Sequence, residues 1–267
     1  MQSYKIKTCR VCKSKLTKIL EIPKTPIGDL YLRTTNKIQN KKFELDLLFC
    51  ENCFAGQIST VVNPKLLYKN FVYRSSISQG LGQHFNKLAK KIIKHNSLSV
   101  NDYVFDIGSN DGLLLSFFKK NRQKVLGIDP AKKIASKASK DGIPTIGEMF
   151  DEKLSKKLSK KYGKAKIIFS NNTMANIDNL SNFLNGVKNV LSEDGVFVFE
   201  TGSFDALIKR KLFDVIYHEH YTYFSTRSLS ILFKKHGLKL FDIEKISTKG
   251  GSLRGYVCQI NENKILT

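Results

Sequence analysis

The sequence lacks any apolar run long enough to cross a membrane. Its best hydrophobic stretches, such as Val196–Phe199, have the length of a strand, whereas a spanning helix needs about 20 apolar residues. No apolar segment follows the basic N-terminal residues, so a secretory signal is not expected. Proline is scarce, at 5 of 267 residues, and 41% of the residues are hydrophobic, which excludes collagen-like and disordered chains. We expect a soluble, cytoplasmic protein that has no membrane partner.

Acidic residues are also scarce. The chain has 23 Asp and Glu against 45 Lys and Arg, which gives a net charge of +22. Such a charge is typical of nucleic-acid-binding proteins, but only 7 of the basic residues are arginine, which is preferred for forked phosphate contacts. The lysines are scattered over every segment. A solvated surface and a polyanion-binding face would both account for the charge, and the lysine bias favours the former.

Four of the five cysteines form two pairs with the same spacing. Cys9 and Cys12 make one C-x2-C, and Cys50 and Cys53 make the other. Two such knuckles complete a closed tetrahedral site of four thiolates. Disulfides are disfavoured because no secretory signal is present. The pattern predicts a structural Zn2+, since four thiolates leave no coordination position for a water molecule. Cys258 lies in an alternating apolar run and is predicted to be a buried core residue.

The hydrophobic pattern divides the chain into three parts. A zinc-binding module is predicted over residues 1–62, with a strand over Phe43–Phe49, and a helical connector over residues 63–98. Residues 99–267 alternate strands and helices, which predicts an α/β domain with a doubly wound parallel sheet. The predicted strands are 103–107, 124–129, 143–146, 166–170, 196–200, 238–246 and 253–260. The predicted helices are 83–95, 113–120, 132–140, 151–162, 180–191 and 226–236.

This pattern is typical of the class I fold of S-adenosylmethionine (SAM) methyltransferases, a Rossmann-like seven-stranded sheet whose last strand is antiparallel. The turn after the first strand, Asp106-Ile-Gly108-Ser109-Asn110, is not the G-x-G-x-x-G of dinucleotide sites. Its glycine allows a cofactor to pass close over the backbone, and the following helix presents its N-terminus. Asp129 ends the second strand, where a carboxylate can accept hydrogen bonds from two ribose hydroxyls. These features predict bound SAM; a bare structural turn is the alternative.

The segment Asp214–Phe224 places two imidazoles and a carboxylate among aromatic rings, as Tyr217-His218-Glu219-His220. A carboxylate beside a histidine can fix its tautomer and raise its basicity, as general-base catalysis requires. A partly buried histidine pair held by hydrogen bonds, or a chance metal cluster, fits the spacing equally well. The H-x-H spacing lacks the helical repeat of zinc proteases, so that chemistry is not predicted.

Together these motifs resemble those of the nucleotide-sugar C-methyltransferase family, SAM-dependent enzymes that carry an N-terminal zinc-binding domain. The resemblance runs over nearly the whole chain, and its most specific parts are Tyr217–His220 and Gly250–Arg254. It also covers the paired cysteines, the glycine loop, the segment Tyr73–Ser78 with His84, and the pair Asn171-Asn172.

The resemblance implies that His220 is the general base, assisted by Glu219 and Tyr217. The base would remove the proton next to a 3-keto group, and the enolate would attack the methyl group of SAM. The cofactor contacts that we expect are Asp106, Gly108, Ser109, Asn110, Asp129 and Asn171. The substrate contacts that we expect are Tyr73, Asn172 and His218.

Two features depart from the family pattern. Asn176 stands where the family has a histidine, and the chain stops at Thr267, where typical members continue into a further α/β domain that helps to hold the nucleotide sugar. A fragment, a partner protein that supplies this domain, or another substrate would each account for the shorter chain. Two other functions stay open. An RNA base methyltransferase predicts basic residues beside the cofactor crevice, and a non-catalytic zinc-bearing binding protein predicts no SAM binding. The ordered motifs favour a nucleotide-sugar substrate over nucleic acid.

Overall fold

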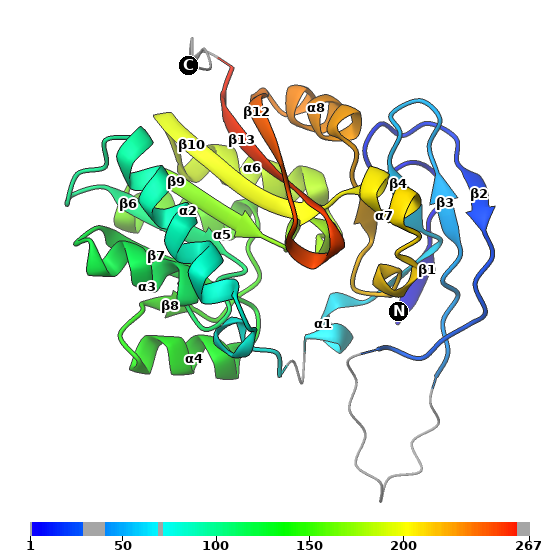
Figure 1. Cartoon of the computed structure of the whole chain (residues 1–267), viewed down its shortest axis with the longest axis horizontal. Helices are drawn as coiled ribbons and strands as arrows, with labels where there is room; N and C mark the ends of the chain where they lie inside the picture. The colour runs from blue at the N-terminus through cyan, green and yellow to red at the C-terminus, as the bar shows by residue number, and fades with distance from the viewer. Residues whose placement is uncertain (1, 29–40, 69–71, 261–267) are drawn as a thin grey trace, which may run out of the picture.

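The computed structural model describes residues 2–28, 41–68 and 72–260 (Figure 1). Its largest element is a seven-stranded sheet with the order β12-β13-β10-β9-β6-β7-β8. The strands are β6 (Tyr103–Ile107), β7 (Lys124–Ile128), β8 (Thr145–Ile146), β9 (Ala165–Asn171), β10 (Leu191–Gly202), β12 (Leu238–Ile246) and β13 (Ser252–Gln259). The pairs from β8 to β10 are parallel, whereas β13 is antiparallel to both of its neighbours. The predicted class I methyltransferase sheet is therefore confirmed.

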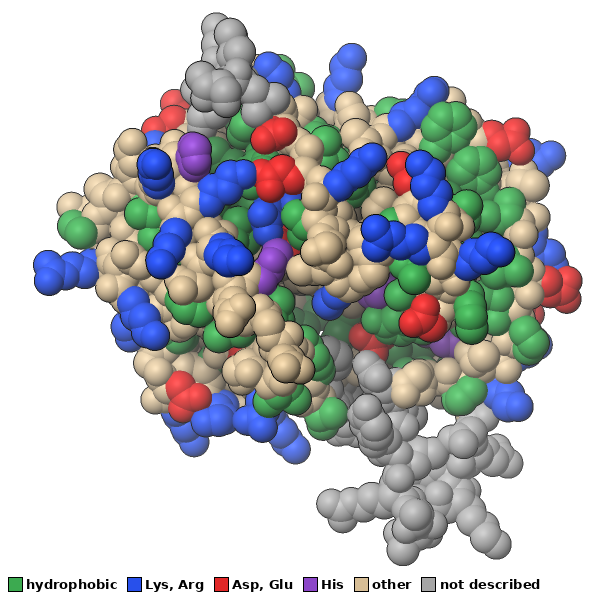
Figure 2. Space-filling view, viewed as in Figure 1, with side chains coloured by type: hydrophobic (Ala, Val, Ile, Leu, Met, Phe, Trp, Pro, Cys, Tyr) green, Lys and Arg blue, Asp and Glu red, His purple; other side chains and the backbone are tan. Residues whose placement is uncertain are grey.

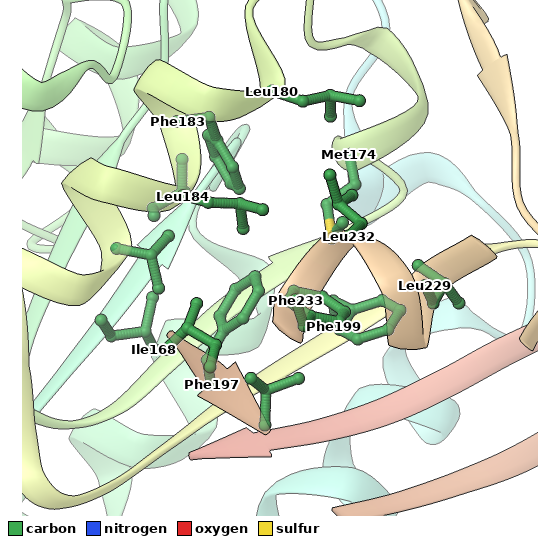
Figure 3. Close-up of a cluster of buried hydrophobic side chains, with 14 of the residues drawn as sticks. Ile168, Met174, Leu180, Phe183, Leu184, Phe197, Phe199, Leu229, Leu232 and Phe233 are labelled. Atoms are coloured by element: carbon green, nitrogen blue, oxygen red, sulfur yellow. The ribbon is translucent and has the colours of Figure 1, made fainter. Parts of the chain in front are cut away.

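Helices cover both faces of this sheet. On one face, α2 (Leu81–His95) and α3 (Leu113–Lys120) pack against the side chains of Val196 and Val198. On the other face, α5 (Glu152–Tyr162), α6 (Leu180–Val190) and α8 (Thr226–Lys235) pack against Phe197 and Phe199. Both rings contact Phe233 of α8, as Figure 3 shows, with centroid distances of 6.2 and 5.3 Å. Alternate residues of β10 thus fill two separate cores, because successive strand side chains point to opposite faces. Helix α4 (Lys132–Lys140) packs beside β8.

The N-terminal part forms a second sheet that includes a strand from the methyltransferase part. Its order is β11-β4-β3-β2, built from β2 (Thr17–Leu20), β3 (Leu47–Phe49), β4 (Gly56–Ile58) and β11 (Thr222–Tyr223). A separate pair joins β1 (Ser3–Lys5) to β5 (Thr60–Val62). Phe204 of α7 (Phe204–Arg210) packs so closely on β4 that a Cβ at Gly56 would lie 2.4 Å from its ring. The zinc part therefore shares its core with the segment that carries the histidines (Figure 1).

Most predicted elements agree with the structure, with a few differences in extent. The strand predicted over Phe43–Phe49 is limited to β3, because Asp46 leaves the ladder to bind the backbone of Ile22 and Ser59. The strand predicted at 143–146 is only β8, since Ile143 packs under the turn at Gly112. The sequence pattern does not indicate α7 or β11.

The shorter helical elements are α1 (Pro64–Leu67), η1 (Ser75–Ile77), η2 (Met174–Asn176), η3 (Phe213–Val215) and η4 (Thr248–Gly250). Cys258 is fully buried, as predicted. Within the described ranges, the helices are too short or too polar to span a lipid bilayer.

Candidate active site and metal centre

A cavity of about 450 Å³ opens at the carboxyl ends of β6, β7 and β9. In open α/β sheets this edge is where ligands bind, because loops from several strands converge there. All but one of the predicted cofactor, catalytic and substrate residues line the cavity: Tyr73, Asp106, Gly108, Ser109, Asn110, Asp129, Asn171, Asn172, Tyr217, Glu219 and His220. The exception is His218. The tertiary structure thus brings together residues that lie up to 147 positions apart, between Tyr73 and His220.

In the turn after β6, Gly108 borders the cavity and has no side chain. Gly108 has a φ of 82°, and a Cβ there would lie 2.1 Å from Oγ1 of Thr173, so only glycine fits. Asp129, at the end of β7, accepts hydrogen bonds from the backbone N–H of Asn110 at 2.9 Å and of Ala131 at 2.8 Å. These two bonds fix the orientation of its carboxylate before any ligand arrives.

Several buried polar groups in the cavity have no partner among the described residues. They are Oδ1 of Asp106, Oγ of Ser109 and both amide atoms of Asn171. Burial raises the pKa of Asp106 to about 7, and the charge of Asp129 adds to the effect. Buried polar groups are normally hydrogen-bonded, so this set fits a ligand that carries hydroxyl and amino groups. SAM carries both, together with a positively charged sulfonium.

Asn110 fits a positioning role as well as a cofactor contact. Its side-chain oxygen accepts from the backbone N–H of Ser75 at 2.9 Å, and its amide donates to the carbonyl of Tyr73 at 2.9 Å. The neighbouring Asp111 accepts from the N–H of Ser76 at 3.0 Å. The cofactor turn therefore holds the Tyr73 segment over the cavity.

His220 is held in one tautomer by the backbone. Its Nδ1 lies 3.1 Å from the carbonyl oxygen of Val215, which only accepts, so Nδ1 carries the proton. Nε2 is then an acceptor and receives the hydroxyl of Tyr217 at 3.0 Å. Burial lowers the pKa of His220 to about 4; the Val215 carbonyl opposes this shift, and the positive charge of Lys249 adds to it. The imidazole is therefore neutral at pH 7.

His218 and Asn176 occupy different environments. His218 is buried away from the cavity, with its ring edge-on to Phe43 at a centroid distance of 5.8 Å. This placement argues against a direct contact with substrate. Asn176 lines the cavity, and its amide donates to the hydroxyl of Tyr68 at 3.2 Å. A polar contact is thus present at the position where the resemblance led us to expect histidine.

The four paired cysteines converge on one point. Their Sγ atoms all lie within 4.8 Å of one another, with Cys9–Cys53 at 3.5 Å and Cys12–Cys50 at 3.4 Å. Tetrahedral Zn–S bonds of about 2.3 Å place sulfur atoms roughly 3.8 Å apart, so the cluster fits zinc. The hydrogen bond from Cys53 lowers the pKa of Cys9 to about 5, which favours the thiolate that a metal requires. The predicted ligand set is confirmed as a cluster, and its four sulfurs leave no open position.

Two further residues, Arg10 and Lys249, were not predicted from the sequence. Arg10 lies between the paired cysteines, and its guanidinium binds the carbonyl of Ile177 at 2.8 Å and Oγ1 of Thr222 at 3.2 Å. It thereby connects the zinc knuckle to the segments that border the cavity. Lys249 lines the cavity itself. The only sequence signal for these two residues was their place inside recognised motifs, between two cysteines and directly before two glycines.

Comparison with known proteins agrees with this geometry. Residues 75–243, well over half of the chain, match the family described as "Methyltransferase domain". The chain belongs to this methyltransferase family. Residues 9–68 also match a family described as "Putative zinc binding domain". The fold is that of SAM-binding methyltransferases, and the four-cysteine cluster lies in the part of the chain that matches the zinc-binding family.

Relatives of the methyltransferase support the same fold. It is 31% identical over 250 residues to the protein named C-methyltransferase NovU of Streptomyces niveus, a match that covers 93% of this chain but only 60% of that protein. The PH0226 protein of Pyrococcus horikoshii OT3 has a TM-score of 0.56 at 16% identity, covering 73% of this chain and 99% of the other. A SAM-dependent methyltransferase of Clostridium acetobutylicum ATCC 824 has a TM-score of 0.51 at 15% identity, covering 73% and 95%. The two solved structures establish the class I fold.

Proposed function

We propose that this methyltransferase transfers the methyl group of SAM to a carbon atom of a nucleotide-linked keto sugar. The observation that carries the proposal is His220, a neutral imidazole whose Nε2 faces Tyr217 in the same cavity as the Asp129 and Gly108 cofactor turn. Methylation at carbon needs a base that removes a proton from carbon, whereas methylation at many heteroatoms does not. The relative named a C-methyltransferase supports this choice.

The reaction follows from the chemistry of ketones. His220 Nε2 takes the proton from the carbon next to the ketone, and the electron pair of the C–H bond forms the enolate. SAM, when bound, would supply the electrophilic methyl group that the enolate carbon accepts. The charge of Glu219, which lines the same cavity, stabilises the imidazolium that results. The Tyr217 hydroxyl, released from Nε2, donates to the ketone oxygen.

The cofactor and the sugar would occupy different parts of the cavity. Asp129 would accept hydrogen bonds from the ribose of SAM, and Asp106 and Asn171, whose buried polar groups lack partners among the described residues, would hold the methionine part. Tyr73 and Asn172 border the remaining space, where the sugar would lie. The chain spans 60% of the length of its C-methyltransferase relative. We therefore limit the proposal for this chain to the sugar and the reacting carbon, and contacts to the nucleotide are left outside it.

The charge distribution favours a small-molecule substrate over RNA. RNA base methylation predicts basic residues beside the cofactor, but Lys249 is the one lysine or arginine among the described residues that line the cavity. Carboxylates lie there as well, at Asp106, Asp129 and Glu219. Lys and Arg side chains are instead dispersed over the visible face (Figure 2), as expected for a solvated surface.

The test is proton exchange, which precedes methyl transfer. In D2O, a nucleotide-linked 3-keto sugar should exchange the proton on the carbon next to the ketone when wild-type protein is present, and should gain a C-methyl group when SAM is added; NMR follows both. His220→Ala should slow both by about 10²–10⁴-fold, the usual contribution of a positioned base. SAM affinity, measured by calorimetry, should stay unchanged. His218→Ala is the matched control and should retain most of the exchange. Exchange by His220→Ala at the wild-type rate would refute the assigned base.

A further inference from the structure

Lys249 occupies a backbone conformation that lysine rarely adopts. Its φ and ψ are 50° and 42°, in the left-handed region, and it is followed by two glycines that also have positive φ. Such non-glycine outliers persist only where the surroundings enforce them, and they cluster at functional sites.

The residues packed around this turn hold Lys249 in the left-handed conformation. A Cβ at Gly250 would lie 2.8 Å from Leu212, and a Cβ at Gly251 would lie 2.8 Å from Ala206 of α7. The Gly250 carbonyl accepts from Arg210 at 2.8 Å, and the Gly251 carbonyl accepts from the N–H of Ser203 at 3.1 Å. Helix α7 thus anchors the two glycines, and the anchored turn presents Lys249 to the cavity.

Lys249 is an exposed residue, so its charge needs no structural partner. None of the described residues forms a hydrogen bond or a salt bridge with its ammonium group, although Glu200 and Glu219 act on it electrostatically. It lines the cavity together with Tyr217, Glu219 and His220. A cation at this place faces the proposed base, and it disfavours the imidazolium unless a negative charge forms between them.

The enolate is that negative charge. We propose that Lys249 stabilises the enolate oxygen during proton removal by His220, an inference that rests on the proposed function. When the C–H bond breaks, the proton passes to Nε2 and the electron pair moves through the new C=C bond onto the ketone oxygen. Preorganised positive charge next to a developing oxyanion lowers the barrier without further rearrangement. When the carbon bonds to the methyl group, the ketone reforms and the oxygen loses its charge.

This role also resolves a difficulty with the base. A buried imidazole of low basicity is neutral at pH 7, but it has little driving force to take a proton from carbon. An enolate held by a cation is a weaker base than a free enolate, so the proton transfer becomes less uphill. The neutral imidazole of His220 and the charged ammonium group of Lys249 then act on opposite ends of the same step.

Three variants test the inference in the exchange assay described above. Lys249→Met removes the charge and keeps the length, Lys249→Arg keeps the charge, and Lys245→Met removes a charge from the exposed face of β12. Loss of one oxyanion-stabilising group typically costs about 10²–10³-fold in kcat. We expect Lys249→Met to lower kcat for exchange by about 100-fold with little change in KM, Lys249→Arg to recover part of the rate, and Lys245→Met to match wild type.

The outcomes separate this inference from the proposed function. If wild type exchanges the proton and Lys249→Met does so at the same kcat, the Lys249 inference is wrong and the proposed function stands. A raised KM with unchanged kcat, together with weaker competition by a nucleoside diphosphate, would also overturn it, because Lys249 would then bind the diphosphate. If wild type exchanges no keto sugar nucleotide, the proposed function fails and the inference fails with it.

Discussion

Replacing Asp129 by alanine should separate cofactor binding from the rest of the chemistry. The carboxylate is 6% exposed, and each oxygen already accepts one backbone N–H, at 2.8 and 2.9 Å. The remaining lone pairs are available to two ribose hydroxyls of SAM. A hydrogen bond to a charged group contributes about 1.5–3 kcal/mol, so losing two would cost about 3–6 kcal/mol of binding free energy. That loss corresponds to a decrease in SAM affinity of roughly 10²–10⁴-fold.

The same substitution should also destabilise the empty protein. Without the carboxylate, the N–H groups of Asn110 and Ala131 lose their acceptors, and each unsatisfied buried donor costs about 1–3 kcal/mol. Calorimetric titration with SAM measures the first effect, and thermal unfolding without SAM measures the second. Asp141→Ala, at the exposed end of α4, is the control and should change neither.

Two results would contradict a ribose contact at Asp129. SAM affinity within about twofold of wild type in a folded Asp129→Ala protein would remove the ribose from this carboxylate. The asparagine amide in Asp129→Asn keeps one acceptor oxygen, but its NH2 group faces a backbone N–H. A large loss of SAM affinity in Asp129→Ala, together with wild-type affinity in Asp129→Asn, would show that negative charge is not needed.

Two further predictions concern the metal and pH. Cys12→Ser should lower the zinc content, measured by elemental analysis, from one ion per chain, and should lower the melting temperature, because structural zinc contributes about 10–16 kcal/mol in small modules. Cys258→Ser should retain full zinc, and a Cys12→Ser protein with one zinc and an unchanged melting temperature would contradict the site. The exchange rate should be flat between pH 6 and 8 and fall only as the pH drops toward 4, because His220 must be neutral and its pKa is about 4. A decline centred near pH 6.5, the value of an ordinary histidine, would show that His220 is not the titrating base.

The local features of this protein could be predicted from the sequence. The predicted strand at 103–107 and the predicted helices at 113–120 and 132–140 coincide with β6, α3 and α4, because apolar periodicity and flanking turn residues are local properties. The metal ligands could also be predicted, since the geometry of a C-x2-C knuckle is set within four residues. The cofactor turn followed from Gly108 and Asp129, whose spacing reflects one strand–helix–strand unit.

How these parts pack against one another could not be predicted from the sequence. No local pattern indicates that β11 pairs with β4, because a two-residue strand has no periodicity and its partner lies more than 160 residues earlier. Through that pairing the zinc part and the histidine segment share one core, which buries His218 against Phe43 and leaves His220 in the cavity. The sequence showed two histidines one residue apart. Their different environments, and the position of Lys249, depend on long-range packing, which fixes which side chain faces the ligand and which faces the core.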